Sequence, residues 1–446
     1  MHAKVRTKVQ TGRKRQREGT VRSTAFQVRE SLGKLRVAGR VLARRPRSQR
    51  VDVLAGLLDS LRDESSTPRR RLEAELPEAA GFSPENVREG LRRGLGPWTG
   101  DELRGLVAQE LGPEPGVGPW TGRRVSGFET TAVVLAGALP MPTLTSMLVP
   151  LVLGSSVLVK PSVHDPVTAR VIADALGELD PELGAAIAIA DFRRDDEPAM
   201  DALLAADCVV ITGSDETIAA VAPRVRPPRR LVSYGHRLSV GALGPDCLEG
   251  EARDQALARF AVDVALWDQL GCLSPVALIV VGGGPDATGS VVDGLASALD
   301  AAESRWPRGP ASLATAASIT HARADAELRG ASGADVQLRV GPGTSWTVVG
   351  EPGPQIRPTP LHRFVRVQPV PGIAELVETL APVARHLAAV GALGFGRQRE
   401  ELEEALVAVG ASRVCPLGEM QAPPLSWCRD AGGVLLPLAR LSSVES

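Results

Sequence analysis

The apolar positions of residues 51–112 recur three and four residues apart, which is the spacing of amphipathic helices. Ser83 followed by Pro84 adds a typical helix start, with a capping hydroxyl and a proline in the first turn. The first apolar run comprises Val51, Leu54, Leu57, Leu58 and Leu61. This part of the chain is therefore predicted to be helical.

Residues 130–159 contain no charged side chain, a stretch long enough on paper to span a bilayer. Pro140, Pro142 and Pro150 divide it into shorter pieces. We expect a strand, an apolar helix and a second strand, at 131–135, 144–153 and 156–159. Parallel strands that are covered on both faces have this composition, so the pattern predicts a buried βαβ unit and no membrane span.

Helix-like and strand-like segments continue to alternate to about residue 240. The expected helices are 166–179 and 198–205, and the expected strands are 185–190 and 208–211. A helix at 252–270 and a strand at 276–281 then open a second α/β layer that extends to about residue 415. This order predicts an α/β protein with a doubly wound parallel sheet.

Composition adds little to the predicted fold class, but it excludes some kinds of site. The chain has 446 residues, 43% hydrophobic and 23% charged, which is ordinary for a globular protein of two domains. Its five cysteines are widely spaced and form no Cys-x-x-Cys pair, so a disulfide framework and a zinc site are not expected. The N-terminus is basic without an apolar segment behind it, so we expect no signal peptide and a cytoplasmic location.

Charge is concentrated at the start of the chain. Residues 1–50 hold 16 Lys and Arg against two Glu, a net charge of +14, whereas the whole chain carries −1. Such a segment can bind nucleic acid, but Phe26 is its only aromatic residue and base stacking has little to use. We favour a solvated, partly disordered extension, and we do not expect nucleic acid to be the main ligand.

One lysine is isolated in the sequence. After Lys34 only Lys160 remains, in a chain with 46 Arg and 5 Lys, and it ends the apolar run 156–159. A compact ammonium is not replaced by the planar guanidinium fork, so Lys160 is a candidate contact for the hydroxyls or phosphate of a nucleotide. The alternative is that a surface lysine has survived by chance.

Two further motifs are candidates for binding and catalysis. Thr212-Gly213-Ser214 lies between a strand and a helix, where free backbone N–H groups favour an anion, although Ser214 can equally be a simple helix cap. Cys272 stands in a Gly-Cys-x-Ser-Pro turn that can expose a nucleophile. The alternative for Cys272 is a small buried hydrophobe, as expected for Cys208 within its apolar strand.

In combination these motifs resemble the aldehyde dehydrogenase superfamily, and more closely its acyl-CoA reductase branch, the LuxC-like fatty-acid reductases. The likeness extends from about residue 50 to the C-terminus. The motifs that carry it are Leu158-Val159-Lys160-Pro161-Ser162, Ile211-Thr212-Gly213-Ser214, Tyr234-Gly235-His236-Arg237-Leu238-Ser239, Asp268-Gln269-Leu270-Gly271-Cys272-Leu273-Ser274-Pro275 and Leu417-Gly418-Glu419-Met420 with Pro423, Pro424 and Trp427.

The resemblance implies a nicotinamide cofactor. Lys160, with Pro161 and Ser162, would contact the adenosine ribose, and Ser214, with Thr212 and Gly213, would meet the pyrophosphate. Many relatives have an acidic residue three positions after the lysine, which binds the ribose diol of NAD. This chain has Val163 there, so the cofactor is expected to be NADPH, with NADH as the alternative.

The resemblance also assigns a reaction. Cys272 would attack a thioester, expel the thiol and form an acyl-enzyme, which hydride transfer would convert to an aldehyde. Relatives that oxidise aldehydes use a glutamate to activate water, and by position Ser233 stands in its place. One departure concerns the oxyanion hole, because Ala138 replaces the asparagine of the first loop and Asn86 is the only asparagine in the chain.

These implications predict NAD(P)H-dependent reduction of a fatty acyl thioester, carried by CoA or a carrier protein, to its aldehyde. The alternatives are a catalytically impaired homologue that binds nucleotide or a partner enzyme, and an oxidising aldehyde dehydrogenase. An acyl-transferring or aldehyde-consuming partner enzyme and a homo-oligomer are also expected. The predicted division is a basic extension at 1–50, a helical and dinucleotide-binding region at 51–240, a catalytic domain at 241–415 and a C-terminal return segment at 416–446.

Overall fold

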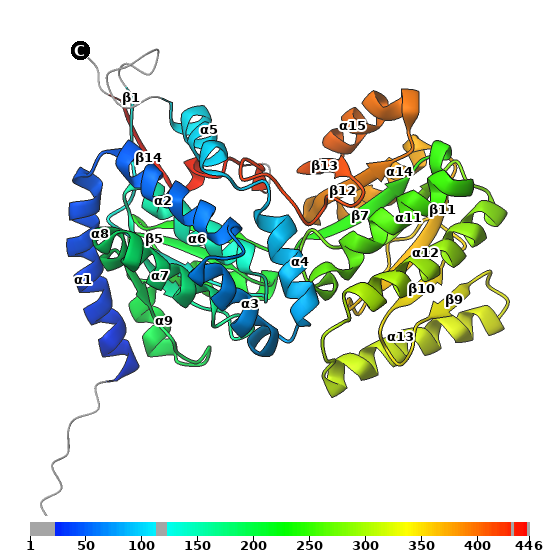
Figure 1. Cartoon of the computed structure of the whole chain (residues 1–446), viewed down its shortest axis with the longest axis horizontal. Helices are drawn as coiled ribbons and strands as arrows, with labels where there is room; N and C mark the ends of the chain where they lie inside the picture. Colours follow the sequence, from blue (N-terminus) through cyan, green and yellow to red (C-terminus); the bar gives the residue numbers. More distant parts are fainter. Residues whose placement is uncertain (1–22, 113–122, 430–431, 444–446) are drawn as a thin grey trace, which may run out of the picture.

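Two α/β lobes lie side by side in the computed structural model, which describes residues 23–112, 123–429 and 432–443 (Figure 1). One lobe contains a five-stranded sheet and the other a seven-stranded sheet, and a two-stranded ribbon pairs residues 123–126 with residues 440–443 near the C-terminus. No helix among the described residues is long and apolar enough to cross a membrane.

Five helices precede the first sheet, and the first of them corrects an expectation. Residues 24–44 were expected within a partly disordered extension but form helix α1, because an apolar stripe from Ala25 to Leu42 is buried against α9 and β3. Residues 1–22 of that extension lie outside the described residues. The helices are α1 (Thr24–Arg44), α2 (Arg47–Arg62), α3 (Thr67–Ala80), α4 (Pro84–Leu95) and α5 (Gly100–Leu111).

The first sheet is parallel throughout, with strand order β4-β3-β2-β5-β6. The chain therefore winds outward in both directions from β2, which confirms the doubly wound fold. Strands β2 and β3 are buried along their whole length. The strands are β2 (Thr130–Val134), β3 (Ser156–Lys160), β4 (Ile187–Ile189), β5 (Cys208–Thr212) and β6 (Arg230–Tyr234). The helices between them are α6 (Pro140–Leu153), α7 (Thr168–Leu179), α8 (Pro181–Ala185), α9 (Glu197–Leu203) and α10 (Asp215–Val221).

The second sheet has the order β13-β12-β7-β8-β11-β10-β9, with only β9 antiparallel to its neighbour. Its helices α11 and α12 pack against each other (Figure 1). The strands are β7 (Leu238–Leu243), β8 (Pro275–Val281), β9 (Gln337–Val340), β10 (Thr347–Gly350), β11 (Phe364–Val370), β12 (Leu387–Leu393) and β13 (Arg413–Pro416). The helices are α11 (Gly250–Ala265), α12 (Pro285–Arg305), α13 (Leu313–Ala331), α14 (Ile373–Leu380) and α15 (Arg399–Ala408).

The C-terminal segment leaves the second lobe and returns to the first. It ends in β14 (Arg440–Ser443), which pairs antiparallel with β1 (Arg123–Ser126). On the way the carboxylate of Glu110 accepts the backbone N–H groups of Val434, Leu435 and Leu436. The segment therefore passes both lobes and contributes residues to the space between them.

Candidate active site

The chain before Cys272 departs from the predicted helix at 252–270. Helix α11 ends at Ala265, and Trp267, Asp268 and Gln269 adopt left-handed φ values of 55°, 49° and 63°. Non-glycine residues in this region are strained by about 1–3 kcal/mol each, and such strain is concentrated at functional sites. The turn that presents Cys272 must therefore be held by its surroundings.

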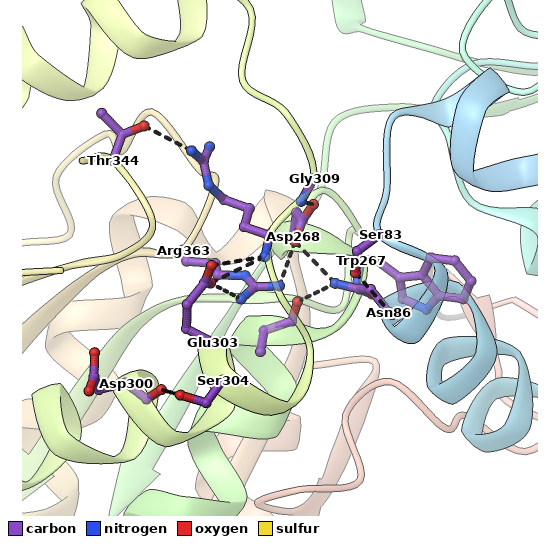
Figure 2. Close-up of polar contacts among 12 residues, drawn as sticks. Ser83, Asn86, Trp267, Asp268, Asp300, Glu303, Ser304, Gly309, Thr344 and Arg363 are labelled. Atoms are coloured by element: carbon purple, nitrogen blue, oxygen red, sulfur yellow. Dashed lines mark hydrogen bonds and ion pairs between the residues drawn. The ribbon is translucent and has the colours of Figure 1, made fainter. Parts of the chain in front are cut away.

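Asp268 is the centre of the contacts that hold this turn (Figure 2). Its Oδ1 accepts from the Asn86 amide at 3.0 Å and from the Arg363 guanidinium at 2.7 Å, and its Oδ2 accepts from the Gly309 backbone N–H at 3.0 Å. Burial raises the pKa of Asp268, and the positive charge of Arg363 acts against that shift. Asn86 also accepts the Trp267 N–H at 2.8 Å, so the only asparagine of the chain connects α4 to the Cys272 turn.

A second left-handed run matches the first. Residues 361–363 have φ values of 61°, 57° and 66°, and Arg363 in this run is the partner of Asp268. Beside it the Gln269 amide accepts from the Phe364 N–H at 2.9 Å and donates to the Phe364 carbonyl at 3.0 Å. Each strained segment therefore holds the other in place.

Cys272 itself is half-buried, at the end of this turn. The Ser239 hydroxyl donates to the Cys272 carbonyl at 2.8 Å and accepts from the Ala389 N–H at 3.1 Å, which ties the loop to β7 and β12. Two other cysteines have different surroundings, because burial raises the pKa of Cys208 to about 12 and that of Cys415 to about 11. Those two thiols are poor nucleophiles at neutral pH.

Cys272 lines a cavity between the lobes, which contains about 940 Å³ of space without protein atoms, part of it open to solvent. The wall is mostly apolar and comes from α6, the Cys272 turn and the C-terminal segment. The lining residues are Trp98, Leu139, Met141, Pro142, Thr145, Ser146, Val149, Val210, Tyr234, Trp267, Cys272, Leu273, Gln421, Pro423, Pro424, Leu425, Trp427, Arg429, Val434 and Leu438.

Polar groups in this wall are few. The indole N–H of Trp427 is buried and has no hydrogen-bond partner among the described residues, whereas that of Trp98 donates to the Pro423 carbonyl at 2.8 Å. The Arg429 guanidinium lies 4.2 Å from the centre of the Tyr234 ring. Sequence reasoning listed Trp427 only as part of a motif and missed its unpaired donor, because pairing depends on packing that the sequence does not display.

Lys160 ends β3 at the carboxyl edge of the first sheet, with only 6% of its surface exposed. Its ammonium lies 5.2 Å from the centre of the Phe192 ring and has no ion pair or hydrogen bond with the described residues. Burial lowers the pKa of Lys160, Asp191 opposes that shift and Arg194 adds to it. The buried ammonium is thus a donor that a ligand hydroxyl or phosphate could satisfy.

The residues after Lys160 form a tight turn. The Ser162 hydroxyl accepts from the His164 N–H at 3.1 Å, and Pro161 is buried beside it. Val163 is 74% exposed at the tip of the turn, so no carboxylate stands there. The turn therefore offers a ligand the Lys160 ammonium and backbone atoms.

Thr212 ends β5, two strands from β3 at the same edge of the sheet. Its hydroxyl is buried and lacks a partner among the described residues, and Gly213 donates to the Tyr234 carbonyl. Ser214 caps α10 by accepting from the Thr217 N–H at 3.3 Å. The first turn of α10 contains Asp215 and Glu216, whose charges oppose an anion at this helix end. The structure therefore brings Lys160 and Thr212 to one edge, and it makes Ser214 a helix cap.

Comparison with known proteins gives the chain relatives. A family model described as acyl-CoA reductase (LuxC) matches residues 46–442. The long-chain acyl-protein thioester reductase of Aliivibrio fischeri is 23% identical over 249 residues, which are 55% of this chain and 49% of that protein. The chain thus spans about half the length of the curated relative it matches.

Solved structures share the fold at low sequence identity. A mutant form of the 1-pyrroline-5-carboxylate dehydrogenase of Thermus thermophilus has a TM-score of 0.72 and 16% identity, over 95% of this chain and 86% of the other. A protein of Sinorhizobium meliloti described as a methylmalonate-semialdehyde dehydrogenase, complexed with NAD, has a TM-score of 0.72 and 14% identity, over 95% and 90%. These likenesses confirm the aldehyde dehydrogenase-like fold and, at such identities, nothing more.

Proposed function

The chain belongs to the acyl-CoA reductase (LuxC) family, and from this premise we propose that it reduces a fatty acyl thioester to the aldehyde through an acyl-enzyme on Cys272, with NADPH as reductant. The observation that carries the proposal is the position of Cys272 in the wall of a largely apolar cavity. Burial of a fatty chain in such a wall contributes about 0.8 kcal/mol per methylene group.

The Cys272 thiolate attacks the thioester carbonyl, the bond from carbon to the leaving sulfur breaks, and the released thiolate takes up a proton. The strained turn holds Cys272 in one orientation for this attack, through the Asp268–Arg363 ion pair and the Ser239 hydroxyl that donates to the Cys272 carbonyl. A Cβ added to Gly271 would lie 2.9 Å from the Leu139 Cδ2, so a larger residue there would displace the Leu139 side chain, which lines the cavity. When bound, NADPH supplies the hydride that reduces the acyl group.

Charge that develops on the carbonyl oxygen requires a donor, and the usual amide is missing because Ala138 occupies its position. Trp427 lines the same cavity, and its buried indole N–H, which has no partner among the described residues, is a donor of the required kind. We assign this role to Trp427. A preorganised donor in a water-poor site is worth several kcal/mol at the transition state.

The preference for NADPH is supported by charge at the edge of the first sheet. Val163 brings no carboxylate that would repel a 2′-phosphate. Two opposite charges act on Lys160, the Asp191 carboxylate, which pairs with Arg170 at 2.6 Å, and the Arg194 guanidinium, which donates to the Thr217 hydroxyl at 3.4 Å. The unpaired donors Lys160 and Thr212 fit the hydroxyls and phosphates of a nucleotide. The residues of this proposed site are Lys160, Pro161, Ser162, Thr212, Gly213 and Ser214.

Ser233 supports reduction over hydrolysis. It is exposed on β6 and cannot act as the general base that an oxidising enzyme uses to activate water. An acyl-enzyme without such a base survives long enough to be reduced. Free acid as the main product would indicate the oxidising alternative.

The second candidate is a catalytically impaired homologue that binds nucleotide or a partner enzyme, and Ala138 at the position of the oxyanion donor favours it. The test is NADPH oxidation with a series of acyl-CoAs and trapping of aldehyde, for the parent, Cys272→Ala and Cys247→Ala. We expect aldehyde from the parent and from Cys247→Ala, and none from Cys272→Ala. NADPH binding without aldehyde from any thioester would support the second candidate and contradict the first.

A further inference from the structure

A second hollow is a crevice lined by residues of α4, α11 and α12 and by residues 417–419. Helix α4 belongs to the first lobe and faces the second, which contains α11 and α12 (Figure 1). It contains about 1040 Å³ of space without protein atoms, part of it open to solvent. Its residues are Arg93, Ala258, Arg259, Val262, Ala298, Ala301, Ala302, Arg305, Trp306, Leu417, Gly418 and Glu419. Of these residues the sequence indicated only Leu417, Gly418 and Glu419, as part of a motif and without a role in binding.

The crevice is cationic. Three arginines line it against one glutamate, Glu419. Arg93 is held, because its guanidinium pairs with Glu89 at 2.6 Å and donates to the Gly418 carbonyl at 3.2 Å. Arg259 and Arg305 are exposed and have no ion pair or hydrogen bond with the described residues, although the Arg305 guanidinium lies 4.7 Å from the centre of the Trp306 ring. Two guanidinium groups are therefore available to an anion.

The crevice and the Cys272 cavity share one wall. Residues 417–419 face the crevice, while Gln421, residues 423–425 and Trp427 line the cavity. Helix α11 holds this wall in place, because its buried Asp263 carboxylate accepts the Gly418 N–H at 2.6 Å and the Met420 N–H at 3.0 Å. A ligand that passes over this wall would have its reacting group in the cavity and an anionic part in the crevice.

We propose that the crevice binds the phosphate groups of coenzyme A when the thioester is an acyl-CoA, with Arg259 and Arg305 as the phosphate contacts. Guanidinium groups bind phosphate oxygens through paired, charge-assisted hydrogen bonds. A small polyanion matches a concave site with two unpaired arginines and an aromatic wall. The inference rests on the proposed function, since it assigns a binding site to the CoA part of the same acyl-CoA substrate.

The test compares two substrates with the same acyl chain, an acyl-CoA and the acyl N-acetylcysteamine thioester, which lacks phosphate. Arg259→Gln, Arg305→Gln and the double variant remove charge and keep length. One lost charged hydrogen bond is worth about 1.5–3 kcal/mol, or roughly 10- to 100-fold. We expect kcat/KM for acyl-CoA to fall by that factor, and kcat/KM for the phosphate-free thioester to stay within about 3-fold.

Arg253→Gln is the matched control, because Arg253 is on α11, outside this crevice, and pairs with Asp254 at 2.8 Å. It should leave both substrates unchanged. An equal loss for both substrates in the Arg259 and Arg305 variants would mean that these arginines support the fold of the wall, and no loss for either would mean that CoA binds elsewhere. Loss with an acylated carrier protein alone would assign the crevice to that partner. Each of these three results overturns the proposal.

Direct binding of CoA, followed by calorimetry, separates this proposal from the proposed reaction. If the parent reduces no thioester but binds CoA, and the double variant binds it at least 10-fold more weakly, the reaction is wrong and the crevice assignment stands. If the parent reduces acyl-CoA and the double variant binds CoA as the parent does, the reaction stands and the crevice assignment fails.

Discussion

Trp427 is a residue for which activity and stability should move in different directions. Trp427→Phe keeps a six-membered aromatic ring and removes the five-membered ring with its N–H, so aldehyde formation should fall on the order of 10²-fold in kcat if that N–H stabilises the oxyanion. Thermal stability should stay the same or rise, since an unsatisfied buried donor destabilises by about 1–3 kcal/mol. Steady-state kinetics and thermal unfolding of one preparation measure both.

Trp98→Phe is the comparison for this variant, because the Trp98 indole N–H already donates to the Pro423 carbonyl. That change should lower stability by about 1 kcal/mol and leave kcat unaltered. A Trp427→Phe variant that unfolds earlier but turns over normally would show that the indole only packs.

Lys160 is predicted to bind the cofactor through a charged hydrogen bond. Lys160→Met should raise the Kd for NADPH by roughly 10- to 100-fold, as expected for loss of such a bond. Lys160→Arg should not restore binding, because the buried space beside Phe192 holds an ammonium and not a guanidinium fork. The Kd is measured by NADPH fluorescence, which needs no turnover. Full binding by Lys160→Met would remove the lysine from the proposed cofactor site.

At this scale the sequence indicated some residues and not others. Lys160 and Cys272 could be found because each is unusual in its own segment, a single lysine at a strand end and a cysteine between glycine and proline. Trp427 and Arg363 could not be found, because their importance depends on partners far away in the chain or on the absence of partners. The carboxylates of Asp215 and Glu216 were visible in the sequence, but their opposition to an anion depends on the helix start being at Asp215.

Helix α4 and the Cys272 turn are coupled through a glycine. A Cβ on Gly90 would overlap the ring of Trp267, which lies in the left-handed run of that turn. Gly90→Ala should therefore destabilise the protein by about 1–3 kcal/mol and lower kcat, although alanine is the better helix former. Denaturant unfolding and the rate of aldehyde formation test this.

Gly105→Ala on α5 is the matched change, since nothing lies within 4 Å of the added Cβ. It should stabilise the protein by up to about 1 kcal/mol and leave kcat alone. If both alanine variants had the same stability and the same kcat, the close approach of α4 to Trp267 would contribute nothing to either.

Helices and strands could be predicted where the spacing of apolar residues within one segment was enough to identify them. The strands β2, β3, β4 and β5 of the first sheet and the helices α2 and α7 followed from patterns within a few residues of each other, whereas β6 was not predicted. Helix α1 was mistaken for part of an extension because its many basic residues suggested a solvated segment. Its apolar side is buried only because α9 and β3 pack against it. The end of α11 was missed because the left-handed run at Trp267–Gln269 is imposed by Asn86 and Arg363, which lie about 180 and 95 positions away.

The stability of the whole molecule should depend on the proton of Asp263. Complete burial raises the pKa of Asp263 from 3.8 to about 7, against the backbone N–H groups of Gly418 and Met420 that lower it. Between those values the folded chain keeps a proton that the unfolded chain has lost, so this contribution to stability decreases as pH rises toward 7, by at most about 1.4 kcal/mol per pH unit. Asp263→Asn should remove that slope.

Chemical unfolding of parent and Asp263→Asn between pH 5 and pH 8 measures the difference. The free energy of unfolding of the parent relative to the variant should fall with rising pH up to about 7 and be level above it. Identical slopes for the two proteins would show that Asp263 stays ionised throughout.

The arrangement of the whole molecule was only partly open to prediction. Alternating segments indicated two α/β layers and a parallel sheet, because each strand is paired with a helix nearby. The ribbon of β1 with β14 joins residues more than 300 positions apart and has no local signature. The same holds for the crevice with Arg259 and Arg305, whose walls come from both lobes. The domain boundaries, the homo-oligomer and a partner enzyme stay predictions.

The most direct test of the central claim is the mass of the protein after mixing with a long-chain acyl-CoA in the absence of NADPH. The account predicts one acyl group per chain, located at Cys272 by peptide mapping, retained in Cys247→Ala, absent from Cys272→Ala, and released as aldehyde when NADPH is added. No acylation of the parent, or an acyl group that persists in Cys272→Ala, would contradict it.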